Sequence, residues 1–177
     1  DALVLAEYCS RVYLIHRRAE LRAERNLAEQ MSEKENIEFI GETVIEERLA
    51  KTFHAAPGRI LVAVYASNFI RIQQVFTQAQ DSFRKVAVVG KSLEKVIDLG
   101  VNLGYLEVDE DTLISVSDIH KYQDDEIVIL ATGNQGEPLD ALDKIVRKHH
   151  RDIKIKDTDT VLITFTPSPG LEVQMYN

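Results

Sequence analysis

The chain has 177 residues, of which 45% are hydrophobic and 28% charged, a composition that is ordinary for a globular domain with a full core. The formal net charge is -8, which argues against loose, charge-driven binding to nucleic acid because such binding needs many lysines and arginines. No apolar run approaches the roughly 18 residues of a membrane span, and no basic signal sequence opens the chain. We therefore expect a cytoplasmic protein with no membrane partner.

Short apolar runs alternate with segments of helical periodicity along the chain. In the first half, the pattern predicts a helix over 2–10, a strand over 12–15, a helix over 19–33, a strand over 37–40, a helix over 42–54 and a strand over 59–65. In the second half, it predicts a helix from Ser67 or Asn68 to 82, a strand over 86–89, a helix over 91–103, a helical turn capped by Ser117, a strand over 127–131, a helix over 138–149 and a strand over 161–165. The lone cysteine, Cys9, is expected in the core and suits a reducing compartment.

Continuous apolar strands joined by helices predict an α/β fold, with a parallel, doubly wound, Rossmann-like sheet in three layers and helices on both faces. In such sheets, ligands bind beyond the carboxyl ends of the strands. The turns that follow predicted strands are therefore the candidate binding sites. They are 16–18, 66–68, 90–92 and 132–137.

A basic cluster directly follows the predicted strand over 12–15. It consists of His16, Arg17, Arg18 and Arg22. The planar fork of arginine suits phosphate, and at the end of a Rossmann strand such a cluster could hold the 2'-phosphate of NADPH. The alternative is a solvated helix start whose arginines pair with glutamates of the same helix, and spacing alone favours this alternative.

A polar, glycine-containing turn follows the predicted strand over 127–131. It contains Gly133, Asn134, Gln135, Gly136 and Glu137, with Pro138 at the start of the next helix. Glycine lets a backbone approach a ligand closely, and free amides at a helix start favour an anion. A turn that uses glycine for geometry alone explains the pattern equally well.

Residues 1 to about 47 resemble part of the NADPH domain of the thioredoxin reductase family. The resemblance rests on the HRRxxxR pattern of His16, Arg17, Arg18 and Arg22, and it implies a 2'-phosphate site at these residues. The family's glycine-rich GxGxxA loop and its Cys-x-x-Cys pair do not occur in this sequence.

Residues from about 48 to 177 resemble the beta-CASP domain of ribonuclease J, in the metallo-beta-lactamase superfamily. The resemblance rests on GRILVAVYASNFIRIQQV, RKVAVVGKSLEKVIDLGVNLGYL, ILATGNQGEPLDAL and IKIKDTDTVLITFTPSPG, in family order. It implies that two turns face an RNA-binding cleft, with contacts from Ser67, Asn68, Arg71, Gly133, Asn134, Gln135, Gly136 and Glu137. Asn134 departs from the serine that is more usual in the family.

The zinc-binding hallmark of these nucleases, H-x-H-x-D-H, does not occur in the sequence. The five histidines are scattered, and the adjacent His149 and His150 would point about 100° apart on a helix. We therefore expect no catalytic residues, no metal and no cofactor in this chain, and neither RNA cleavage nor NADPH-dependent reduction.

These observations predict a recombined or engineered α/β scaffold without activity of its own, with a junction near 46–51 inside one composite domain over 1–177. It would keep remnants of binding loops and would bind phosphate, a nucleotide or RNA weakly. The alternatives are an RNA-binding beta-CASP module of a ribonuclease J-like nuclease and an NADPH-binding oxidoreductase fragment. The oligomeric state is left open.

Overall fold

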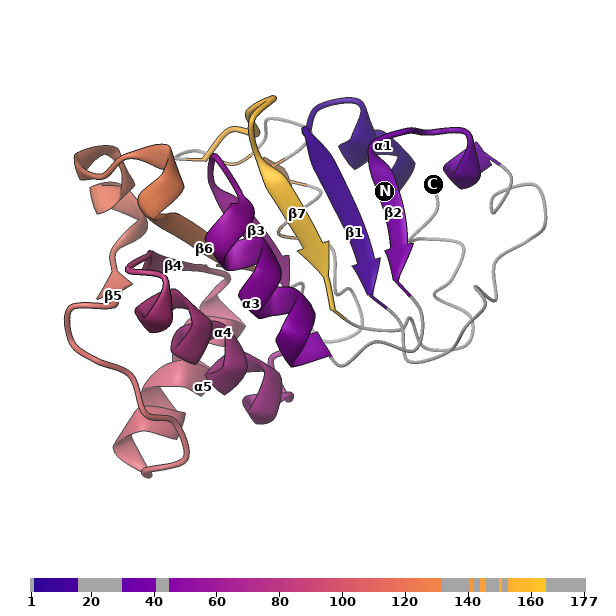
Figure 1. Ribbon diagram of the computed structural model, residues 1–177. Helices are drawn as coiled ribbons and strands as arrows, with labels where there is room; N and C mark the ends of the chain where they lie inside the picture. Colours follow the sequence, from indigo (N-terminus) through magenta and orange to yellow (C-terminus); the bar gives the residue numbers. More distant parts are fainter. Residues whose placement is uncertain are drawn as a thin grey trace.

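A seven-stranded parallel sheet runs through the described part of the chain. The computed structural model describes residues 2–15, 30–40, 45–131, 141, 144–145, 150 and 153–164. The strands are β1 (Arg11–Ile15), β2 (Ile37–Ile40), β3 (Ile60–Ala63), β4 (Lys85–Val89), β5 (Leu113–Ile114), β6 (Ile127–Ala131) and β7 (Thr160–Ile163). Their order is β2-β1-β7-β3-β6-β4-β5, and every pairing is parallel (Figure 1). The predicted parallel α/β class is confirmed.

Helices cover both faces of this sheet because the central strands β3, β6 and β7 bury their side chains on both sides. The described helices are α1 (Ala2–Ala6), α3 (Ile45–Ala55), α4 (Phe69–Asp81) and α5 (Lys91–Asn102), with 3-10 turns η1 (Val116–Lys121) and η2 (Asp124–Glu126). In β6, Val128 and Leu130 pack in the core that contains the buried sides of α3, α4 and α5. Ile127 and Ile129 pack on the opposite face, in the core that includes α1. This alternation follows from the two-residue period of a strand.

The predicted strands match the observed ones within about two residues, except for β5, which the sequence did not predict. Two residues give too short a run for any periodicity to register. The helical turn η1 is capped by Ser115, whose hydroxyl accepts a hydrogen bond from the backbone N–H of Ser117. The predicted cap, Ser117, is therefore wrong by two positions.

The helices expected over 19–33 and 138–149 fall mostly outside the described residues.

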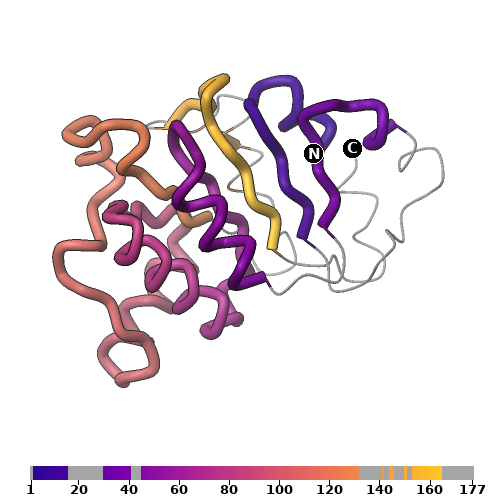
Figure 2. The backbone as a smooth tube through the Cα atoms, in the orientation of Figure 1, coloured from indigo at the N-terminus to yellow at the C-terminus, as the bar shows by residue number. Residues whose placement is uncertain are grey.

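The amino-terminal strands belong to the same sheet as the rest of the chain. Strand β7 lies between β1 and β3, with Val161 opposite both Val12 and Leu61. Figure 2 shows the indigo tube of β1 beside the yellow tube of β7. The sheet thus contains strands from both sides of the expected junction near 46–51, which falls within α3. The division of the chain at that point stays a prediction.

A buried ion pair joins the starts of β3 and β7. The Arg59 guanidinium donates from Nε to Asp159 Oδ1 at 2.8 Å and from Nη2 to Oδ2 at 2.6 Å. The side chains are only 5% and 0% exposed. Arg59 also donates to the carbonyl of Lys154, and Asp159 accepts from the backbone N–H of Lys156. Both charges are therefore well supplied with hydrogen bonds, which a buried pair needs in order to offset its desolvation.

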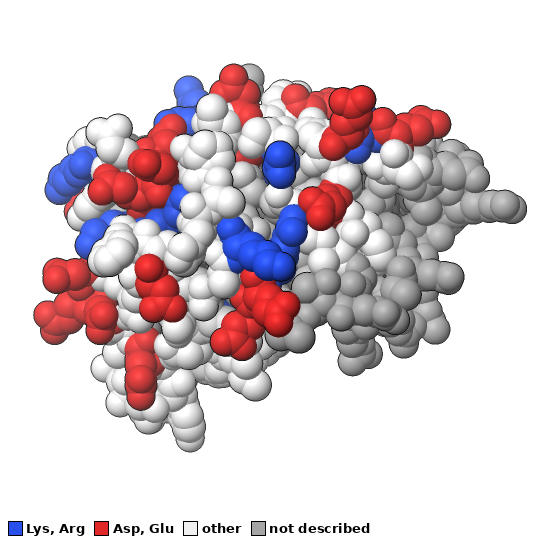
Figure 3. All heavy atoms as spheres, in the orientation of Figure 1, with Lys and Arg blue, Asp and Glu red and all other residues white. Residues whose placement is uncertain are grey.

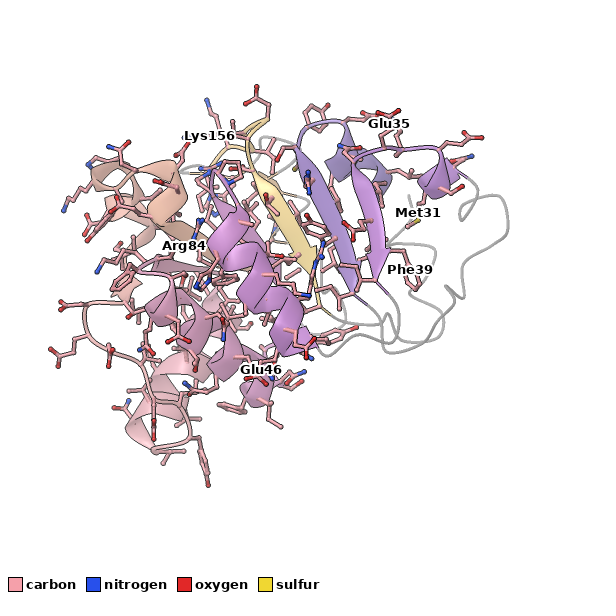
Figure 4. The ribbon with its side chains drawn as sticks, in the orientation of Figure 1. Met31, Glu35, Phe39, Glu46, Arg84 and Lys156 are labelled. Carbon is pink, nitrogen blue, oxygen red and sulfur yellow. The ribbon has the colours of Figure 1, made fainter. Side chains whose placement is uncertain are left out.

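A second buried arginine holds the end of α3. Arg84 donates to the carbonyls of Phe53, Ala56 and Gly58, at 2.7 to 3.0 Å. The last carbonyls of a helix have no partner within the helix, and a cation is favourable at this end of the helix dipole. In Figure 4, Arg84 lies toward the end of α3 that is opposite to Glu46. Arg84 directly precedes β4, so this contact fixes α3 against the sheet.

We expect Asp159→Ala to lower the free energy of unfolding by about 3 to 5 kcal/mol, because it leaves the Arg59 charge buried and unpaired. Urea unfolding followed by circular dichroism measures the change. The matched control is Asp124→Ala, which removes an exposed pair with Lys156 at 2.6 Å and should cost at most about 1 kcal/mol. Equal effects of the two substitutions would contradict a structural role for the buried pair.

Cys9 is buried, as expected, at the carboxyl side of α1. Burial, helped by the nearby Asp159 carboxylate, raises the pKa of its thiol from 9.0 to about 12. A raised pKa favours the protonated native state, so this contribution to stability is full below about pH 9 and is lost as the pH rises toward 12. At pH 8 the native thiol is therefore almost entirely protonated.

We expect iodoacetamide at pH 8 to label native Cys9 far more slowly than the urea-unfolded chain. A pKa difference of about three units lowers the thiolate fraction about a thousandfold. Mass spectrometry gives the two rates, and Cys9→Ser gives the background. Equal labelling in the presence and absence of urea would show that the thiol is open to solvent.

Candidate nucleic-acid interface

The carboxyl ends of the strands meet at one edge of the sheet, because every pairing is parallel. Ala63 at the end of β3 lies opposite Ala131 of β6 and Ile163 of β7. The backbone N–H of Val64 donates to the carbonyl of Ala131 at 3.1 Å. The Thr164 hydroxyl donates to the carbonyl of Ala63 at 2.8 Å. The ends of β3 and β6 are therefore adjacent. The predicted glycine turn follows β6 in the sequence.

Strand β1 ends at the same edge, two strands away from β3. Neighbouring strands are about 4.8 Å apart, so the ends of β1 and β3 are separated by about 10 Å. The basic cluster of His16, Arg17, Arg18 and Arg22 lies outside the described residues, as do Gly133, Asn134, Gln135, Gly136 and Glu137. What the structure shows is that the strands preceding both groups end at this edge.

The remaining candidates, Ser67, Asn68 and Arg71, lie at the start of α4. Asn68 is the N-cap, and its side-chain oxygen accepts a hydrogen bond from the backbone N–H of Arg71 at 3.0 Å. This selects Asn68 from the two predicted caps. Ser67 and Asn68 are both exposed. The first amides of a helix lack partners within it and carry a partial positive charge, so this helix of 13 residues directs an anion-attracting end toward the sheet edge.

Arg71 presents a partly buried cation in the first turn of α4. Its Nη1 donates to Gln74 Oε1 at 2.7 Å, while its buried Nε has no hydrogen-bond partner in the described part of the chain. Burial lowers the pKa of this guanidinium, but an arginine remains charged at neutral pH. A guanidinium that a neighbouring side chain holds in place is suited to a phosphate oxygen.

Sequence reasoning missed Gln74, which orients Arg71. The signal was available in the spacing, because residues three apart on a helix are neighbours. It also missed the contacts that fix α4. The Gln73 side chain exchanges two hydrogen bonds with the backbone of Glu107, at 2.8 and 2.9 Å. The Phe69 and Tyr105 rings lie 6.4 Å apart. These contacts join distant segments, so local patterns do not reveal them.

The described residues contain no group of three or more His, Cys, Asp or Glu side chains placed to hold a metal ion. His54 faces the carbonyl of Ala50, and His150 Nδ1 accepts a hydrogen bond from the backbone N–H of Ile153. Both histidines therefore make local backbone contacts. Within the ranges that the structure covers, no helix has the length and apolarity needed to cross a membrane.

An all-parallel sheet with helices on both faces and a helix start at its carboxyl edge defines a protein of the doubly wound α/β class, in which ligand sites lie at that edge. Residues 57–177 match the family described as ribonuclease J, beta-CASP domain. This match covers more than half of the chain. The chain belongs to the ribonuclease J family through its beta-CASP domain.

Several curated relatives are similar over about three quarters of the chain. Ribonuclease J2 of Bacillus subtilis (strain 168) is 42% identical over 132 residues, which are 75% of this chain and 24% of that protein. Ribonuclease J 2 of Staphylococcus saprophyticus is 41% identical over 136 residues, 77% of this chain and 24% of that protein. Ribonuclease J 2 of Staphylococcus aureus (strain NCTC 8325) is 39% identical over the same shares. The chain thus spans about a quarter of the length of these relatives.

These matches overturn two predictions. A recombined or engineered scaffold without activity is wrong as the function, because the relatives are named ribonucleases and share about 40% identity. The expectation that the isolated chain is not an enzyme is contradicted by the same matches, since the relatives are named ribonucleases, although this chain covers only the beta-CASP part. A missing zinc motif in a quarter of such an enzyme says nothing of the remaining three quarters. The thioredoxin reductase resemblance of residues 1–47, with its NADPH site, stays a prediction.

We expect Asn68→Ala to lower the free energy of unfolding by about 1 kcal/mol, because it removes the side-chain acceptor for the Arg71 amide. Asn68→Asp keeps an acceptor and should retain most of the stability. Thermal unfolding followed by circular dichroism compares the two variants. Equal losses would indicate that this cap contributes nothing to α4.

Proposed function

We propose that this chain is the RNA-binding beta-CASP module of a ribonuclease J-like, zinc-dependent nuclease. In this proposal the carboxyl edge of the sheet faces the RNA backbone. The zinc ions, which the family resemblance implies in a beta-lactamase-type domain, would activate the water that cleaves the RNA. The family match and the relatives' names support the reaction class.

The observation that carries the proposal is the position of the Arg71 guanidinium in the first turn of α4, beside the carboxyl edge of the sheet. The Arg71 side chain is partly buried beside the edge where parallel sheets bind ligands, and Nη1 donates to Gln74 Oε1, which orients the group. A phosphate oxygen from an RNA strand would accept a charge-assisted hydrogen bond from this guanidinium. The exposed Ser67 and Asn68 lie beside it and would position the same strand.

The charge of the protein requires this contact to be local. A net charge of -8 repels a polyanion at long range, so affinity must come from hydrogen bonds at the sheet edge. In the proposal, Gly133 to Glu137, which follow β6 in the sequence, would provide backbone amides. His16, Arg17, Arg18 and Arg22, which follow β1 in the sequence, would provide a second cation site.

The test is fluorescence anisotropy with a labelled single-stranded oligoribonucleotide at low salt. We expect weak binding, no tighter than about 100 μM. Arg71→Gln should weaken it about tenfold, since a charge-assisted hydrogen bond contributes roughly 1.5 to 3 kcal/mol. Lys51→Gln is the matched control, because it removes one positive charge from an exposed position on α3.

Binding by the Lys51→Gln variant should equal that of the unsubstituted chain. If both substitutions weaken binding equally, the interaction depends on total charge and the Arg71 site is wrong. If Arg71→Gln has no effect while binding persists, the RNA lies elsewhere on the molecule. A circular dichroism spectrum of each variant confirms that α4 is intact.

A further inference from the structure

A groove separates α5 from the chain segment 108–116. It consists of two adjoining hollows of about 420 and 400 Å³, which share Ile97, Asp98 and Leu113. One hollow extends beside β4 and β5, and the other follows the carboxyl half of α5. Volumes of this size lie within the range of ligand sites in proteins. The groove is distinct from Ser67, Asn68 and Arg71, none of which lines it.

The walls of the groove are fixed by packing. Gly100 of α5 sits so close to its neighbours that an added Cβ would lie 2.7 Å from Leu106 Cδ1 and 2.9 Å from Phe69 Cε1. Across the groove, β5 pairs with β4 through Val86 opposite Leu113. Neither wall has to move for the groove to exist. A preformed site loses less conformational entropy on binding than one that must be ordered.

The floor of the groove is apolar and partly open to solvent. Ile97 is buried, whereas Leu113 is 36% and Val101 42% exposed. Strand β5 is the last in the sheet order and contains only two residues, so little of the sheet covers this region. Exposed apolar groups that line a hollow are typical of interaction sites, in contrast to apolar groups scattered singly over a surface.

The rim of the groove is acidic. Glu94 and Asp98 line it from α5, and Asp109 and Glu110 line it from the opposite segment. All four side chains are exposed, none forms an ion pair with another described residue, and neither hollow is lined by a Lys, Arg or His. Lys91 and Lys95 are also exposed on α5 but do not line the groove. Figure 3 shows acidic side chains gathered over the loop from α5 to β5, at the lower left of the view.

This combination of charge and apolarity selects one kind of occupant. An acidic rim repels RNA and also repels a second copy of the same groove. A metal ion is not favoured, since the described residues contain no cluster of three or more metal-ligating side chains. A ligand that suits both floor and rim must carry apolar groups flanked by positive charges.

We propose that the groove between α5 and segment 108–116 binds a basic peptide segment of a partner protein, with apolar side chains in the two hollows and lysines or arginines against the rim. The rim carboxylates steer and orient the segment, while the apolar contacts hold it. This role is separate from the proposed RNA contact at the carboxyl edge, so the two proposals can fail independently.

The test uses three fluorescent synthetic peptides of equal length and fluorescence anisotropy. One alternates lysine and leucine, the second alternates lysine and serine, and the third alternates glutamate and leucine. The lysine–leucine peptide should bind at least about tenfold more tightly than either of the others, because only it satisfies both floor and rim. If the lysine–serine peptide binds as tightly, the surface is a general acidic patch and the proposal is wrong.

Two double variants locate the site. Asp98→Asn with Glu110→Gln should weaken binding of the lysine–leucine peptide by about fivefold or more. Glu46→Gln with Glu47→Gln removes the same charge from exposed positions on α3 and should leave the affinity within about twofold. All four carboxylates are exposed, so both variants are expected to fold, which circular dichroism verifies. Equal weakening by the two double variants would overturn the proposal.

Discussion

The Arg59–Asp159 ion pair fixes the alignment on which the rest of the sheet depends. It joins residues that precede β3 and β7, which are 100 positions apart in sequence. The backbone of Asp159 also accepts hydrogen bonds from the N–H and hydroxyl of Ser10, just before β1. Three central strands are therefore aligned at their amino ends by one buried residue. Because these strands are parallel and of similar length, strands that start together also end together. The turn before α4 therefore lies at the carboxyl edge that the three strands share.

The fold could be predicted from the sequence where the physical signal is local. Apolar runs such as 127–131 mark strands buried on both faces, and β6 has these limits in the structure. Asn68 is a good cap because of its short side chain, so the start of α4 was predictable to one residue. The edge strand β5 was not, because two residues carry no period. The order of the strands depends on contacts such as Arg59 with Asp159, which no local pattern contains.

The candidate interface was predictable in part. The rule that ligands bind at the carboxyl ends of parallel strands directs attention to Ser67 and Asn68, and a resemblance supplied Arg71. The physical state of Arg71, half-buried with one unused donor, depends on its packing and on Gln74. The function was predicted wrongly because two resemblances, to the thioredoxin reductase family and to ribonuclease J, were taken to indicate a recombined scaffold. The chain covers 24% of the length of such relatives.

Charge is distributed unevenly over this fold. The carboxyl edge has a partly buried arginine and a helix start, whereas the groove beside β5 is lined by carboxylates without basic partners. A net charge of -8 is thus an average over two surfaces of opposite local charge. In the two proposals, one surface binds an anion and the other binds a cation. Like charges near the groove direct a nucleic acid away from it. Such separation lets a protein of acidic composition contact an anion at one place and a cation at another.

The central position of β7 has a consequence for the order of assembly during synthesis. In the described sheet, β1 and β2 are linked to the other strands only through β7. A ribosome that adds roughly 5 to 20 residues per second needs several seconds to proceed from β3 to β7. Until then, the nascent chain contains two half-sheets, and each exposes an unpaired hydrophobic edge that can join another chain. The period in which this protein is most exposed to aggregation therefore ends when its last described strand inserts between the first and third.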